Sequence, residues 1–378
     1  LVAVVVLLVA IEGLFYALDD GAFHQANYIV ADPELGVRMI PGSTMRQRYL
    51  GGDEIVGIRI NADGYRGEDF PVDATPRIAV VGDSLTFGLG VNDEETYTQR
   101  LDDLMGERAA GLNYGVPSYG PVAKEALVSE ILEGPETHVI VFTINIGRVF
   151  APKRPGHPGP TARDGRFVRP DLAEGHERWP LPGWLVRHSH AIDRLRIWRY
   201  GPHGRPEEIR EAAKGRWRNI SMEATRVTEE RRRLAEAGWY QLKGADGSVR
   251  AWSSVAPLIR RLKAACAQKN TRLVLLLIPT DLQLSPAQWE KYGLEPEESL
   301  KLEIVTEDLL ATAEAIGVPA LDVTPLLGAM PQQPFLSVDW HLTPEAHDVV
   351  ARALHETLIA HKMIPPKAPE EPADHGER

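Results

Sequence analysis

The stretch "RIAVVGDSLTFG", residues 77–88, decides the fold. Its apolar run at residues 78–81 is typical of a strand that is covered on both faces of a parallel sheet. The run stops at Gly82-Asp83-Ser84, and a helical segment follows the serine. Ligands of such sheets bind outside the carboxyl ends of the strands, so its position makes Ser84 a candidate nucleophile.

Strand and helix patterns alternate along the rest of the chain. We expect strands at 78–82, 111–116, 138–145, 272–280 and 320–325, and helices at 94–109, 121–134, 254–270, 300–317 and 343–361. Strands separated by helices require right-handed crossovers, and these produce a mainly parallel sheet with helices on both faces. The pattern therefore predicts a three-layer α/β/α fold.

The composition changes along the chain and suggests five parts. They are a membrane anchor or signal segment (1–18), an extension with a hairpin (19–75), the core (76–150 and 251–362), a helical insert (151–250) and a disordered tail (363–378). The insert is basic and rich in tryptophan. Because it follows the carboxyl end of a strand, we expect it to form a lid or a substrate-binding subdomain. A solvated helical face with a small tryptophan core is the alternative.

The first part reads "LVAVVVLLVAIEGLFYAL" and is apolar apart from Glu12. This run is near the length that crosses a bilayer. No lysine or arginine precedes Arg38, so the positive-inside tendency places the body on the extracytoplasmic side. We favour a membrane anchor over a cleaved signal peptide, with a buried core helix as the third option. The Glu12 carboxylate argues against the membrane interpretation, because a charged side chain in lipid costs free energy.

Charge and cysteine content exclude several classes of function. The net charge of −11 argues against nucleic-acid binding. The one cysteine, Cys266, has no partner for an intrachain disulfide and lies in an amphipathic helical pattern as a packing residue. No Cys/His cluster has zinc spacing, so we expect neither a metal nor another cofactor.

A serine nucleophile needs a base and a group that orients the base. The segment "VDWHLTPEAH" supplies Asp339 and His341 just before the last helix. In an extended segment, a spacing of two puts both side chains on the same side. His341 is the candidate base for Ser84, and Asp339 the candidate for holding the imidazole tautomer.

The same reaction needs donors for the oxyanion. The candidates are the amide of Ser84, Gly115 at the end of the second strand, where glycine allows close approach of backbone, and the side chain of Asn145 at the end of the third. Arg66 and Arg148 are further candidates for contact with a substrate, but salt-bridged surface positions are the preferred interpretation for both.

Ser84 in "GDSL", Gly115, Asn145 and His341 occur in the order that defines the SGNH, or GDSL-type, hydrolases. The chain resembles this family over roughly residues 76 to 362, with the insert excepted. "NADGYRGEDF" and "LLLIPTDLQLSPAQW" also resemble membrane-anchored bacterial members. Two blocks depart from the family pattern. The third block reads "TINI" where Gly-x-Asn-Asp is usual. The last has Asp-x-His in place of Asp-x-x-His, a spacing similar to that of periplasmic polysaccharide acetyltransferases.

The resemblance implies a flavodoxin-like fold and ester hydrolysis or acyl transfer, with Ser84 as nucleophile, His341 as base, and Ser84, Gly115 and Asn145 as the oxyanion hole. Our first hypothesis is a membrane-anchored serine hydrolase that acts on small acyl esters, either small molecules or envelope glycans. An O-acyltransferase of the same family is the second. A catalytically inert protein that binds glycan with its insert is the third.

Overall fold

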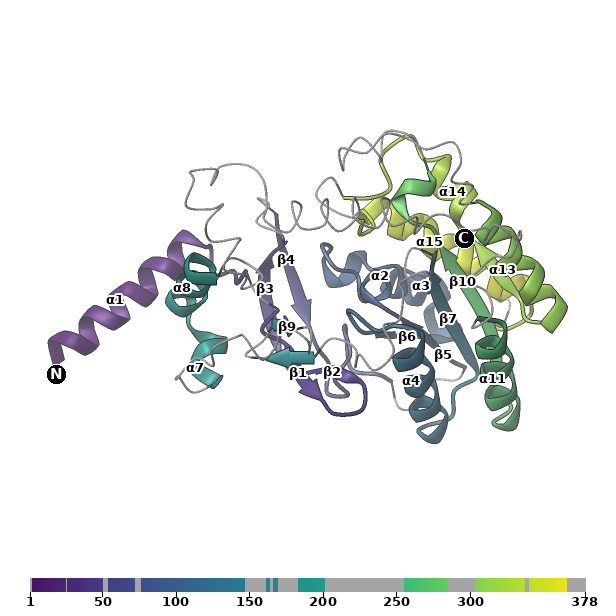
Figure 1. Ribbon diagram of the computed structural model, residues 1–378, viewed down its shortest axis with the longest axis horizontal. Coiled ribbons are helices and arrows are strands. Elements are labelled where there is room, and N and C mark those ends of the chain that lie inside the picture. Colours follow the sequence, from purple (N-terminus) through teal and green to yellow (C-terminus); the bar gives the residue numbers. More distant parts are fainter. Residues whose placement is uncertain are drawn as a thin grey trace, which may run out of the picture.

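The computed structural model describes residues 2–24, 26–49, 54–71, 76–146, 161–163, 166–168, 183–200, 255–284, 303–336 and 340–365. A parallel sheet with strand order β11-β10-β7-β5-β6 forms its centre (Figure 1). The strands are β5 (Arg77–Gly82), β6 (Ala110–Gly115), β7 (Val139–Asn145), β10 (Arg272–Ile278) and β11 (Ala320–Asp322). All five were predicted from the sequence, and β5 and β7 are buried along their whole length.

Helices cover both faces of this sheet. They are α2 (Ser84–Phe87), α3 (Tyr97–Met105), α4 (Pro121–Glu133), α11 (Val255–Gln268), α13 (Glu303–Ile316), α14 (Thr324–Gly328) and α15 (Pro344–Ala360). One buried cluster joins the sheet to α4, α11 and α13, and a second joins the opposite face to α3 and α15. The predicted three-layer α/β/α fold is therefore confirmed. Thr343 caps α15 through its side chain, and Pro344 is its first residue.

The extension at residues 19–75 packs on the core through two hairpins. These are β1 (Ile29–Asp32) with β2 (Gly36–Met39), and β3 (Thr44–Arg48) with β4 (Ile55–Arg59). Their apolar side chains, including Ile29, Val37 and Ile58, belong to the same buried cluster as Val81 of β5. The extension is therefore a structural part of the core. The described residues also include three 3₁₀ turns: η2 (Asp93–Glu95), η3 (Gly106–Arg108) and η5 (Asp281–Gln283).

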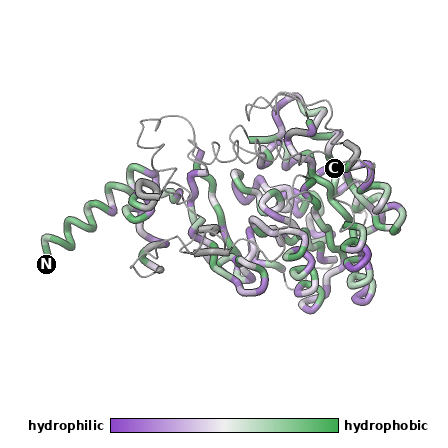
Figure 2. The backbone as a smooth tube through the Cα atoms, viewed as in Figure 1, coloured by the Kyte–Doolittle hydropathy of each residue, from purple (hydrophilic) through white to green (hydrophobic). Residues whose placement is uncertain are grey.

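The N-terminal helix α1 (Val2–Leu18) projects from the body (Figure 1), and Figure 2 shows it as a continuous hydrophobic segment. None of its residues is buried. Among the described residues, no helix combines the length and hydrophobicity required to span a bilayer. The membrane anchor therefore stays a prediction.

Part of the insert is described: β8 (Thr161–Arg163), β9 (Arg166–Val168), α7 (Gly183–His188) and α8 (His190–Tyr200). Helix α8 lies against α1. The carboxylate of Glu12 accepts hydrogen bonds from the Ser189 hydroxyl at 2.6 Å and from the His190 amide at 2.6 Å. Glu12 thus caps the start of α8, where a carboxylate is favoured by the helix dipole. The described helices of the insert contact the N-terminal elements. The rest of the insert lies outside the described residues, and its role as a lid stays a prediction.

Two buried side chains of the helical layers, Cys266 and His347, are packing residues. Cys266 is buried in α11, and burial raises the pKa of its thiol to about 11. His347 is buried in α15, where its Nδ1 accepts a hydrogen bond from the Tyr97 amide at 3.0 Å. Burial lowers the pKa of His347 to about 3, and nearby positive charges act in the same direction. His347 is therefore a neutral acceptor that fixes the start of α3.

Candidate active site

The turn after β5 presents Ser84 as the first residue of α2. Asp83 caps this short helix: its Oδ1 accepts from the Leu85 amide at 3.1 Å, and its carbonyl accepts from the Phe87 amide at 2.9 Å. Gly88 ends the helix in the left-handed conformation, with φ of 84°, which favours glycine. These local bonds hold Ser84 in place, and its side chain is only 3% exposed.

Two glycines allow α2 to press against the sheet. A Cβ on Gly82 would lie 1.7 Å from Thr86 Oγ1, and one on Gly115 would lie 2.2 Å from the Phe87 amide nitrogen. The close approach predicted at Gly115 is thus an approach to α2. The Gly115 amide donates to Asn113 Oδ1 at 2.9 Å. Its role in an oxyanion hole stays a prediction.

The structure brings His341 to Ser84. His341 Nε2 lies 2.8 Å from Ser84 Oγ, although the two residues are 257 positions apart. The imidazole is 6% exposed and its ring stacks on Trp340 at a centroid distance of 5.7 Å. The loop that carries it is closed by a bridge between Phe335 and Leu342 and by a hydrogen bond from the Leu336 amide to the His341 carbonyl. This is the nucleophile–base geometry of serine catalysis.

Strand order explains where the other candidates lie. β5 lies between β6 and β7, so Ser84 follows a strand flanked by those that end in Gly115 and Asn145. Asn145 is 5% exposed and lines a small cavity of about 20 Å³ with Lys124 and Thr143. Asp339 lies outside the described residues, so its predicted part in the site stays a prediction.

Tyr49 belongs to this site although nothing in its local sequence predicts it. Its hydroxyl lies 2.7 Å from His341 Nδ1, the ring nitrogen opposite the one that faces Ser84. Tyr49 follows β3 and is separated from His341 by 292 positions. No spacing pattern links residues so distant, and a tyrosine after an amphipathic strand is ordinarily a packing residue.

A buried ion pair lies beneath the nucleophile turn. Lys124 Nζ of α4 lies 3.5 Å from Asp83 Oδ2 and donates to the Thr143 carbonyl of β7 at 2.9 Å. Both charged side chains are almost fully buried. A buried charge requires compensation of this kind, so Lys124 ties the residue before Ser84 to the neighbouring strand. In the sequence, Lys124 is indistinguishable from the exposed lysines of an amphipathic helix.

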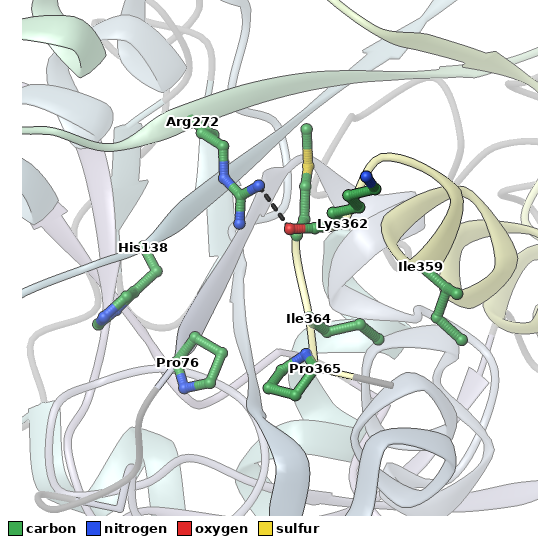
Figure 3. A pocket seen from close by; sticks show the side chains of 8 residues that line it. Pro76, His138, Arg272, Ile359, Lys362, Ile364 and Pro365 are labelled. Carbon is green, nitrogen blue, oxygen red and sulfur yellow. Dashed lines mark hydrogen bonds between the residues drawn. The ribbon is translucent and has the colours of Figure 1, made fainter. Parts of the chain in front are cut away.

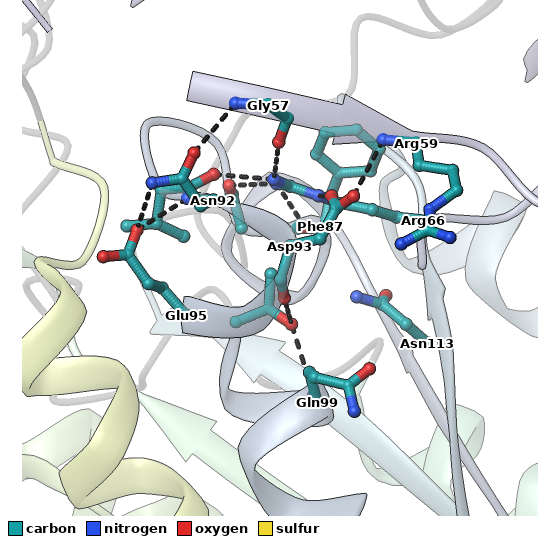
Figure 4. Close-up of polar contacts among 12 residues, drawn as sticks. Gly57, Arg59, Arg66, Phe87, Asn92, Asp93, Glu95, Gln99 and Asn113 are labelled. Atoms are coloured by element: carbon teal, nitrogen blue, oxygen red, sulfur yellow. Dashed lines mark hydrogen bonds and ion pairs between the residues drawn. The ribbon is translucent and has the colours of Figure 1, made fainter. Parts of the chain in front are cut away.

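Arg66 holds the loop that follows α2 (Figure 4). Its guanidinium pairs with Asp93 Oδ1 at 2.7 Å, as the expected salt bridge. It also donates to the carbonyls of Phe87, Gly88, Gly57 and Val91. The expectation of a surface position was wrong, since Arg66 is 1% exposed. One of its five N–H donors thus binds the Asp93 carboxylate, and the other four bind backbone carbonyls that no sequence pattern reveals. Arg148 lies outside the described residues.

A pocket of about 730 Å³ lies at the amino ends of the strands, at the end of the sheet opposite Ser84 (Figure 3). It is lined by Pro76, His138 and Arg272, which stand at the amino ends of β5, β7 and β10. Arg272 closes one side by donating to the Lys362 carbonyl at 2.7 Å. Catalytic groups of parallel sheets gather at the carboxyl ends, so this pocket is separate from the Ser84 site.

Comparison with known proteins was made against families and structures. Residues 236–374 match the family model described as "SGNH hydrolase-like domain, acetyltransferase AlgX". A search of curated proteins gave no match. The lipase/acylhydrolase from Enterococcus faecalis is a similar solved structure, with 8% identity, a TM-score of 0.39, and coverage of 78% of this chain and 100% of that one. Another is Est24, a carbohydrate acetylesterase from Sinorhizobium meliloti, with 11% identity, a TM-score of 0.37, and coverage of 76% and 100%.

The family match confirms the resemblance to SGNH hydrolases that the sequence indicated. The matched range includes Asp339 and His341 and lies downstream of Ser84. Together with the five-stranded parallel sheet, it supports an SGNH hydrolase-like fold for the core.

Proposed function

We propose that this chain is a serine esterase that acts through an acyl-enzyme on Ser84. The observation that carries the proposal is the 2.8 Å contact between His341 Nε2 and Ser84 Oγ at the carboxyl end of a parallel sheet. A hydroxyl at this distance from a neutral imidazole can transfer its proton as it attacks a carbonyl carbon. The site needs no cofactor for this reaction.

In the proposed cycle, Ser84 carries the acyl group and His341 carries the proton between the steps. His341 Nε2 takes the hydroxyl proton while Ser84 Oγ forms a bond to the ester carbonyl carbon, and the carbonyl oxygen becomes an oxyanion. Collapse of this intermediate breaks the bond to the alcohol oxygen, which receives the proton from His341. Water then attacks the acyl-enzyme by the same route and releases the acid. Asp339 is proposed to assist His341, and the Ser84 and Gly115 amides with the Asn145 side chain to bind the oxyanion.

Acyl transfer is the second candidate, and the match to an acetyltransferase family model favours it. The chemistry is identical up to the acyl-enzyme, after which a sugar hydroxyl replaces water. Small acyl esters on envelope glycans are the proposed substrates for both activities. Measuring acetyl transfer to an added oligosaccharide against release of free acetate distinguishes them.

Labelling with a fluorophosphonate probe tests whether Ser84 is an activated nucleophile. We expect the wild-type protein to be labelled and the Ser84→Ala variant to lose the label, because the probe phosphonylates only a serine activated by a base. The variant Ser129→Ala is the control, since Ser129 is an exposed hydroxyl that donates to the Glu125 carbonyl of its own helix. Equal labelling of wild type and Ser84→Ala would instead favour the inert glycan-binding protein.

We also propose that α1 anchors the protein to a membrane with the body on the extracytoplasmic side. Support comes from its exposed apolar side chains, including Val6 and Leu8, and from α8, which supplies partners for the Glu12 carboxylate. A carboxylate with hydrogen-bonding partners is less costly near lipid than an isolated one. The proposed partners are therefore a membrane and an ester substrate.

Charged substitutions in α1 test the anchor. We expect the wild type to co-sediment with phospholipid vesicles and the double variant Val6→Glu/Leu8→Glu to lose most of this binding, because each carboxylate opposes burial in lipid. Val122→Glu, a matched change at an exposed apolar position of α4, should leave binding unchanged. Equal sedimentation of all three proteins would contradict the proposal.

A further inference from the structure

Both ring nitrogens of His341 have hydroxyl neighbours. Nε2 faces Ser84 Oγ at 2.8 Å, and Nδ1 faces Tyr49 Oη at 2.7 Å. Both distances are those of good hydrogen bonds. The imidazole therefore lies between two hydroxyl groups. The Ser84 hydroxyl comes from the core, and the Tyr49 hydroxyl comes from the N-terminal extension.

The roles of the two nitrogens follow from the proposed chemistry. A base that accepts the Ser84 proton must present a lone pair at Nε2, so in the neutral ring the hydrogen is on Nδ1. Nδ1–H then donates to Tyr49 Oη. We propose that Tyr49 is a positioning residue that holds His341 in the tautomer and orientation required for catalysis. This inference rests on the proposed function and identifies a further component of the same site.

The tyrosine ring is held firmly enough for this role. It packs against the backbone at Gly90, where an added Cβ would lie 3.0 Å from Tyr49 Cδ1 and 2.5 Å from Leu336 Cδ1. Gly90 itself adopts a φ of 87°, which favours glycine. Leu336 belongs to the same loop as His341, since its amide donates to the His341 carbonyl. The Tyr49 and His341 rings meet edge to face at 5.9 Å.

The inference differs from the arrangement that the sequence predicted. Asp339 was the candidate for orienting His341, and a carboxylate stabilises an imidazolium more strongly than a neutral hydroxyl does. Tyr49 and Asp339 are compatible if both lie near Nδ1, where one N–H is shared between two acceptors. In either case, loss of the Tyr49 hydroxyl removes a hydrogen bond that fixes the tautomer and orientation of His341.

The experiment removes this one oxygen. We expect Tyr49→Phe to lower kcat on 4-nitrophenyl acetate by about 10- to 100-fold with KM nearly unchanged, since a hydrogen bond to a group that becomes charged is lost. Tyr119→Phe is the matched control: it removes a buried hydroxyl that donates to the Val37 carbonyl at 2.8 Å, and should leave kcat within about threefold. Thermal unfolding of both variants measures any general loss of structure.

A second readout does not depend on turnover. The ¹⁵N chemical shifts of the His341 ring, assigned by comparison with His341→Gln, report which nitrogen carries the hydrogen. We expect the Nδ1–H tautomer in the wild type and a mixture of tautomers in Tyr49→Phe.

The outcomes separate the inference from the proposed function. Wild-type activity in Ser84→Ala would disprove the proposed function. An inactive Ser84→Ala together with wild-type kcat and tautomer in Tyr49→Phe would overturn the role of Tyr49 alone. The same holds if Asp339→Asn abolishes the tautomer preference and Tyr49→Phe does not.

Discussion

Replacing Ser84 with alanine or His341 with glutamine is expected to lower kcat on an activated acetyl ester by about 1,000- to 10,000-fold. The reason is that nucleophile and base act as one unit. Without the imidazole, the hydroxyl keeps its proton, and without the hydroxyl, the imidazole has nothing to activate. The 2.8 Å contact between them is the structural basis of this expectation.

The double variant gives the sharper result. If the two side chains form one unit, Ser84→Ala/His341→Gln loses no more activity than either single variant, so the free-energy losses do not add. His138→Gln is the control, since His138 lies at the opposite edge of the sheet, beside the pocket at the amino ends of the strands. Each variant is first shown to retain the wild-type circular dichroism spectrum. A double variant whose loss equals the product of the two single losses would disprove a shared function.

The fold was predictable from the sequence because its signal is local. Strands β5, β7 and β10 are short runs dominated by apolar residues, as expected where both faces of a sheet are covered. The turn at Gly82 and the cap at Thr343 are also predictable from the sequence. The turn requires a glycine, and the cap requires a short polar side chain. Ser84 and His341 could be proposed because strand ends of a parallel sheet meet at one edge.

The supporting residues could not be predicted, because their environments are created by distant segments. Tyr49, Arg66 and Lys124 each look like surface or packing residues in their own segments. Each becomes part of the site through groups 19 or more positions away, as with Lys124 and the Thr143 carbonyl. Hydrophobic periodicity shows which residues are apolar, but it does not show which polar side chain is enclosed by folded backbone.

Arg66→Met is expected to lower the free energy of unfolding by about 3–5 kcal/mol. The substitution leaves the Asp93 carboxylate without its buried counter-charge, and it leaves the carbonyls of Phe87, Gly88 and Val91 without their donors. The Arg66 guanidinium lies over the Phe87 ring at 4.9 Å. We expect methionine to fill part of this volume and to contact the same ring, so the loss measures the polar contacts. Chemical denaturation followed by tryptophan fluorescence and circular dichroism together measures the change and tests for a two-state transition.

Arg59→Met provides the matched control for Arg66→Met. Arg59 lies in the same segment and pairs with Glu68 at 2.6 Å, but both of these side chains are about half exposed or more. Water screens an exposed pair, so we expect its loss to cost less than about 1 kcal/mol. Since Arg66 binds the carbonyls at the end of α2, the helix that begins with Ser84, we also expect Arg66→Met to slow fluorophosphonate labelling below its unfolding temperature. If both arginine variants unfold at the same denaturant concentration, the buried network does not stabilise the nucleophile turn as the structure indicates.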